Sequence, residues 1–236
     1  MGIYHYFKQL YYIWQLSKIH SLLWLKPIIT KNDLFFSIKK LANIKPYMDV
    51  FINNQLFKIF YNLNLAKLSY LTNEIEAVFK LTDNMRNSIL DLPADLKSLN
   101  ITKNIKYFIS LLTIQATNNK LIKVMEENNQ ADEVINSANN LTNQINIMLE
   151  AANKDTFLQN NKNNILIYYL LAEKFKIDFY LHGGIQINQE FINFVKRFDD
   201  KQSFINFITS NNFPKELNFN DNQKKFNDFI LNMKQN

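Results

Sequence analysis

Residues 42–71 read ANIKPYMDVFINNQLFKIFYNLNLAKLSYL, and the apolar spacing changes within this stretch. Two short apolar runs, Asp49–Ile52 and Gln55–Phe60, are separated by Asn53-Asn54, a dipeptide that suits a β-hairpin turn. Pro46 disfavours a helix leading into the first run. After Phe60, leucines recur every three residues at positions 65, 68 and 71, which indicates an amphipathic helix. The stretch therefore predicts a hairpin followed by a helix.

The residues before this stretch fit alternating strands and helices. Ile3–Phe7 is rich in aromatic residues, which favours a strand. Trp24–Thr30 contains Pro27, which permits an edge strand, and a helix that carries Leu34, Ile38 and Leu41 begins near Asp33. A helix is predicted between these two strands. A spacing of three to four residues, which suits one helix face, separates Leu10, Trp14, Ser17 and Ser21. Residues 1–71 thus read β-α-β-α-β-β-α, and a purely helical interpretation of residues 1–40 stays open because short apolar runs fit both.

The residues after position 97 have a helical period throughout. Helices are predicted over 103–127, 131–152 and 164–181, followed by shorter ones over 188–198, 203–210 and 221–234. The 164–181 segment is apolar nearly all round, which marks a buried central helix with Leu166, Leu170 and Phe175 in the core. Gly183-Gly184 then supplies a left-handed helix stop.

Composition excludes several kinds of site. The chain has 236 residues, 47% of them hydrophobic, and no cysteine, which excludes disulfides, thiolate metal sites and cysteine nucleophiles. No run reaches 18 apolar residues, so we expect a cytoplasmic protein without a transmembrane span. Residues 1–50 hold seven Lys and two Asp, so they carry +5 of the net charge of +6. Only Arg86 and Arg197 are arginines, which argues against sequence-specific nucleic-acid binding.

The order of several short motifs resembles the glutathione transferase family. The matching segments are Asn43–Tyr47, Tyr70-Leu71, Leu92–Asp95, Phe157-Leu158 with Asn164, and Gln189–Thr209. The last segment is similar to the stringent starvation protein A branch, whose members bind RNA polymerase and lack transferase activity. The resemblance implies an α/β thioredoxin-like domain over residues 1–81, a linker over 82–96 and an all-helical domain over 97–236. An all-α helical bundle is the alternative fold.

The chain departs from that family at the positions that bind glutathione. Val50-Phe51 stands in place of the cis-proline, Leu63-Asn64 in place of the Glu/Gln-Ser pair, and Ile167 in place of a capping Asp. Val50, Phe51 and Asn64 are therefore the candidate ligand contacts. Losing two anchors at about 1–3 kcal/mol each weakens binding by roughly 30-fold to 20,000-fold. We expect no bound cofactor, and glutathione only if the chain is an active transferase.

Candidate catalytic side chains each have a simpler structural interpretation. The resemblance places Tyr6 where a hydroxyl stabilises the glutathione thiolate, but Tyr6 also suits core packing. Gln9 cannot act as a nucleophile, and we interpret Tyr11 as packing. His182 fits a general base or a helix C-terminus that favours positive charge. Two adjacent pairs, Asp199-Asp200 and Lys224-Lys225, are interpreted as solvated groups.

The sequence thus predicts a non-catalytic protein that acts by binding macromolecules. The resemblance implies RNA polymerase as the protein partner, and a homo- or heterodimer. The first alternative is a glutathione transferase that uses Tyr6. The second is an adaptor in a translation or membrane-docking complex, with the basic N-terminal region in contact with its partner or with a membrane surface.

Overall fold

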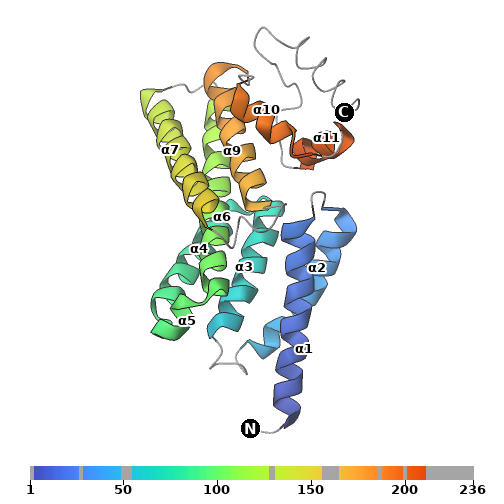
Figure 1. Ribbon diagram of the computed structural model, residues 1–236. Helices are drawn as coiled ribbons and strands as arrows, with labels where there is room; N and C mark the ends of the chain where they lie inside the picture. Colours follow the sequence, from blue (N-terminus) through green and yellow to red (C-terminus); the bar gives the residue numbers. More distant parts are fainter. Residues whose placement is uncertain are drawn as a thin grey trace. The chain divides into compact units, whose positions relative to one another are not determined.

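A computed structural model describes residues 3–26, 29–48, 55–127, 131–155, 165–184, 188–198 and 201–210. Every regular element in these ranges is helical (Figure 1). In chain order the elements are α1 (Ile3–His20), the π-helical turn η1 (Ser21–Leu25), α2 (Lys31–Ile44), the 3-10 turn η2 (Lys45–Tyr47), α3 (Gln55–Leu71), α4 (Ile75–Leu90), α5 (Ala94–Ser98), α6 (Asn100–Glu126), α7 (Asp132–Lys154), α9 (Ile165–His182), α10 (Gln189–Val195) and α11 (Lys201–Ser210).

The chain divides into two compact units, Met1–Ala116 and Thr117–Asn236. The division falls within α6, so one continuous helix contributes to both units. Residues 82–96, the linker expected from the sequence, contain the end of α4 and the start of α5.

The predicted α/β thioredoxin-like domain is wrong, and the all-α alternative fits the structure. Gln55–Phe60, the second strand of the expected hairpin, is the first part of α3. Ile3–Phe7 belongs to α1, and Trp24 lies in η1 rather than in an edge strand. The other expected strand, Asp49–Ile52, and its turn Asn53-Asn54 lie outside the described residues.

The burial of α3 explains why its sequence resembled a strand. Phe57, Ile59, Tyr61 and Leu63 are all buried, so apolar residues alternate along the first half of the helix. In the structure α3 contacts α1, η1, α2 and α4. A helix covered on several sides needs apolar residues around most of its circumference, and a short stretch of such a helix can show a period of two.

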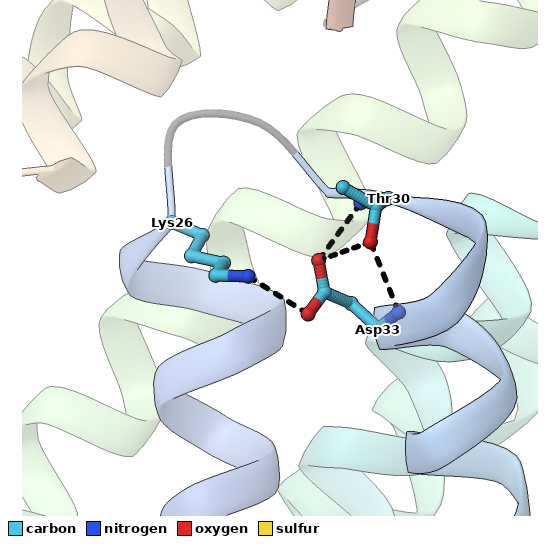
Figure 2. Close-up of polar contacts among 3 residues, drawn as sticks. All are labelled: Lys26, Thr30 and Asp33. Atoms are coloured by element: carbon cyan, nitrogen blue, oxygen red, sulfur yellow. Dashed lines mark hydrogen bonds and ion pairs between the residues drawn. The ribbon is translucent and has the colours of Figure 1, made fainter.

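A capping box starts α2 and ties it to the end of η1 (Figure 2). The Thr30 hydroxyl oxygen accepts the Asp33 N–H at 3.2 Å, and the Thr30 N–H donates to the Asp33 carboxylate at 2.9 Å. Lys26 Nζ lies 2.8 Å from the other oxygen of Asp33. Hydrogen bonding to Lys26, and then to Thr30, lowers the pKa of Asp33 to about 2. The contact therefore fixes where α2 begins and joins that start to the residue after η1.

Helix α9 is the centre of the second unit, as the sequence predicted. Leu166, Leu170 and Phe175 are buried, which confirms the expected core, and α9 contacts α7 and α10. Gly183 follows the helix with a φ of +66°, the left-handed conformation expected of a glycine stop. The rings of α10 and α11 extend this core, since Phe194 lies 6.1 Å from Phe207.

Candidate interaction surface

The side of α1 that faces away from its own core carries large apolar side chains. Tyr12, Leu16 and Ile19 are buried on the inner side of the helix. The outer side carries a continuous stripe at a spacing of three to four: Phe7 (64% exposed), Leu10 (44%), Tyr11 (50%) and Trp14 (51%). Leu10 and Trp14 lie on one face of α1, as their spacing predicted. Tyr11 was expected to pack in the core, but half of its side chain is exposed. Exposed apolar side chains that gather on one side of a helix are a feature of interaction sites.

Helix α2 also exposes aromatic side chains. Its buried side is formed by Ser37, Leu41 and Ile44, while Phe35 is 70% exposed and Phe36 is 37% exposed. The helix that the sequence predicts from about Asp33, carrying Leu34, Ile38 and Leu41, is confirmed as α2. Of these three side chains only Leu41 is buried, and Ile38 is exposed.

A surface groove of about 380 Å³ joins the two helices, because Phe36 of α2 lines it together with residues of α1 and η1. Its lining is Trp14, Ser17, Lys18, Ser21, Leu22 and Phe36. The two serine hydroxyls donate to carbonyls within their own helical segment, Ser17 to Ile13 and Ser21 to Ser17, both at 3.1 Å. The lining therefore combines rings and leucine with one cation.

A lysine follows each of three exposed rings by one helical turn. The pairs are Trp14 with Lys18, Phe35 with Lys39, and Phe36 with Lys40. Lys18 Nζ lies 3.6 Å from the centre of the Trp14 ring, and Lys40 Nζ lies 5.5 Å from the centre of the Phe36 ring. We group the exposed apolar side chains of α1 and α2 and these lysines under the name aromatic–lysine face: Phe7, Leu10, Tyr11, Trp14, Phe35 and Phe36, with Lys18, Lys39 and Lys40. Of this group, Trp14, Lys18 and Phe36 line the shared groove.

The aromatic–lysine face carries positive charge, and in the described residues no ion pair is shown for Lys18, Lys39 or Lys40. Asp33 is the one acidic residue among positions 1–48 of the sequence. Its carboxylate is held by Lys26 and Thr30, at the start of α2. The lysines of the face are therefore available to an anionic partner.

The residues expected to bind glutathione are not seen together. Tyr6 lies in α1, with its side chain outside the described part, and Val50 and Phe51 also lie outside the described residues. Asn64 is fully buried in α3, where its side-chain N–H donates to the Phe60 carbonyl at 2.9 Å. Gln9 is half-buried on α1. The glutathione site stays a prediction, and the thioredoxin-like fold on which it was based is wrong.

Asn64 belongs to a polar cluster that the sequence analysis missed. His20, at the end of α1, lies 5.1 Å from the Phe60 ring and 5.4 Å from the Phe108 ring. Burial lowers the pKa of His20 to about 4, and a contact with Asn64 partly opposes this shift. Lys67 is buried with its Nζ 4.8 Å from the Trp24 ring. Aromatic rings surround the cluster, so we interpret it as part of the core; no local pattern distinguishes a buried Lys67 from a surface lysine.

A second buried polar cluster links α6 to α9 within the second unit. Asn118 Nδ2 donates to the Glu173 carboxylate at 2.7 Å, and Lys176 Nζ lies 2.8 Å from the other oxygen of Glu173. All three side chains are buried. Removing one partner of such a cluster leaves a buried charge without compensation, which is strongly destabilising. This cluster too escaped the sequence analysis, because the apolar run of α9 hides its two charges.

Of the three other candidates that the sequence offered, the structure describes only His182. His182 is the last residue of α9 and is exposed. Asp199-Asp200 and Lys224-Lys225 lie outside the described residues.

In the ranges that the structure describes, no three His, Cys, Asp or Glu side chains gather closely enough to hold a metal ion. No helix of those ranges is long and apolar enough to cross a membrane. Comparisons with protein-family models, with curated proteins and with solved structures found no match to this chain.

Proposed function

We propose that this chain is a non-catalytic binding protein that docks onto a larger partner, a protein complex or a membrane, through its aromatic–lysine face. The observation that supports the proposal is the outward stripe of α1, in which four successive apolar side chains face solvent beside Phe36 of α2. Keeping rings in water is unfavourable, at about 25 cal/mol per Å² of apolar surface. Covering this stripe with a partner removes that cost.

The charged groups of the face fit the same role. Lys18 and Lys40 lie over rings of the face. For a partner that carries negative charge, both the apolar contact and the lysines strengthen binding. For a neutral or basic partner, only the apolar contact does. RNA polymerase, the protein partner that the starvation-protein resemblance implies, stays a prediction.

Site-specific photo-crosslinking tests the proposal. A benzophenone amino acid replaces Phe36 in the groove, and the matched control carries it at Ile147 of α7, a residue that is 69% exposed on the other unit. After illumination in a cell extract that retains its membranes, we expect crosslinked products, protein or lipid, from position 36 and not from position 147. Adding Trp14→Glu should reduce the yield from position 36 at least about tenfold, because a carboxylate enters the apolar stripe.

Equal product yields from positions 36 and 147 would show that the face has no special role. Products from position 36 that persist with Trp14→Glu would place the partner elsewhere than on the stripe. Both variants change exposed positions, so circular dichroism should show the same helicity as the parent protein.

A further inference from the structure

We propose that the partner of the aromatic–lysine face is the surface of an anionic lipid bilayer. This inference rests on the proposed function, and it goes further by naming the chemistry of the partner. The protein would bind peripherally, with the rings of α1 and α2 at the level of the lipid head groups and the lysine ammonium groups on lipid phosphates.

The geometry of α1 suits a flat apolar boundary. Phe7, Leu10, Tyr11 and Trp14 are all exposed and follow one side of the helix over two turns. Seven residues of an α-helix rise by about 10 Å, so the stripe presents a line of side chains parallel to the helix axis. Phe36 extends this line sideways onto α2 through the shared groove. A helix that displays Trp, Phe and Leu along one side can lie in the plane of a membrane interface.

The amphipathic residues of the face fit the head-group region. Trp14 and Tyr11 combine a large ring with one polar group, and such side chains concentrate at the boundary between lipid tails and water. The ammonium group of Lys18 lies over the Trp14 ring. The aliphatic stem of a lysine can accompany a ring into the interface while its charge stays with the phosphates.

The cations of the face are lysines, as are all but two of the chain's 27 basic residues, and lysine suits a bilayer better than it suits the other anionic partners. Residues 1–50 contain seven lysines and no arginine. The centres of protein–protein interfaces are depleted of Lys and enriched in Arg. Nucleic-acid sites also rely on Arg, whose planar fork matches bases and phosphates. A lipid surface needs only point charges near its phosphates, and each lysine close to it strengthens binding roughly fivefold.

Vesicle binding of the full chain tests this inference. The probes are vesicles of phosphatidylcholine alone and vesicles that also contain phosphatidylglycerol. We expect the protein to sediment with the anionic vesicles, to remain in solution with the neutral ones, and to dissociate as salt is raised, because salt screens the attraction.

Trp14 provides an internal reporter of the contact. The chain has two tryptophans: Trp14 is half exposed and Trp24 is fully buried. Anionic vesicles should therefore shift the emission of the wild-type protein to shorter wavelength. Trp14→Phe keeps a ring in the stripe but leaves only the buried tryptophan, so this variant should bind without the shift.

Two triple variants of equal charge separate the face from the total charge. Replacing Lys18, Lys39 and Lys40 by Gln should weaken binding to anionic vesicles about 100-fold, the product of three roughly fivefold factors. The control replaces three exposed lysines elsewhere in the same unit, Lys80, Lys103 and Lys106. This control lowers the net charge equally and should bind like the wild type to within about threefold.

Several results would overturn the lipid assignment. Equal effects of the two triple variants would show non-specific attraction by net charge. Failure to bind anionic vesicles, combined with a protein product from the benzophenone at position 36, would assign the face to a protein and leave the proposed function intact. A dimer that Trp14→Glu converts to monomer would assign it to a second copy of this chain. Absence of vesicle binding and of any specific crosslink would contradict both proposals.

Discussion

At the scale of single residues, His20 shows how the first unit accommodates polar groups among its aromatic rings. Its imidazole contacts Phe60 and Phe108, and burial lowers its pKa to about 4 from the ordinary value of 6.5. The neutral form therefore dominates in the folded protein down to about pH 4. In the unfolded chain the same group binds a proton near pH 6.5.

This difference predicts a loss of stability in mild acid. Between pH 6.5 and about 4 the unfolded state binds more protons than the folded state, so the free energy of unfolding decreases as the pH falls. The total decrease is about 1–3 kcal/mol. His20→Phe fills the site with a ring that does not titrate, and urea denaturation at pH 7.5, 6, 5 and 4 should show a flatter pH dependence. Parallel curves for the two proteins would mean that His20 is not the group responsible.

At the scale of elements, the capping box fixes the start of α2, the helix that carries Phe35 and Phe36. The Thr30–Asp33 contacts fix the first turn of the helix (Figure 2). Phe35 and Phe36 follow within the next turn. A cap that fails lets this turn unwind, because its first N–H groups then have no partner in the helix. The order of the aromatic–lysine face therefore depends on residues outside it.

Asp33→Asn should lower the free energy of unfolding by about 1 kcal/mol at pH 7, since it removes the ion pair with Lys26 and weakens the cap. The pKa of Asp33 is lowered from 3.8 to about 2 in the folded protein. Its stabilising effect is therefore complete above pH 3.8 and is lost as the pH falls towards 2. Urea denaturation at pH 7, 4 and 2.5 should show the difference from wild type shrinking in that range.

The matched control is Asp95→Asn, because Asp95 lies in the first turn of α5, whose start has no side-chain cap. This exposed substitution should change the free energy of unfolding by less than about 0.5 kcal/mol. A control effect as large as that of Asp33→Asn would show that net charge, and not the capping box, is responsible.

At the scale of the whole molecule, the aromatic–lysine face and the most apolar helix, α9, belong to different units. The first unit contains the aromatic–lysine face and most of the net positive charge. The second unit is built on α9, whose Leu166, Leu170 and Phe175 are buried. A defect in the second core should therefore affect stability without affecting vesicle binding.

Leu170→Ala tests this separation. Truncating a fully buried leucine should cost about 2–5 kcal/mol, whereas Ile147→Ala, at an exposed position of the same unit, should cost less than about 0.5 kcal/mol. Calorimetry measures both, and the folded Leu170→Ala protein should bind anionic vesicles like the wild type. A melting temperature within a degree or two of wild type would show that α9 is peripheral.

The sequence alone determined the elements with a sustained helical period. The helices over 103–127 and 131–152 were predicted from apolar spacing and are close to the observed α6 and α7. The buried centre around Leu170 and the positive charge of the first 50 residues were also readable from local pattern. These features depend on neighbours in the chain, which the sequence contains in full.

Only the tertiary structure decided the rest. Helix α1 has apolar residues on two opposite sides, Leu16 and Ile19 on one and Leu10 and Trp14 on the other, and only contact with α3 shows which side is the core. The alternating apolar residues of Gln55–Phe60 fit a strand equally well. Only the helices packed around α3 explain why apolar residues are needed on several of its sides. Apolar spacing reports that a side chain prefers to be covered, but it does not identify the neighbour that covers it. The exposed stripe of α1, and with it the proposed interaction surface, could therefore be recognised only after the helices were packed.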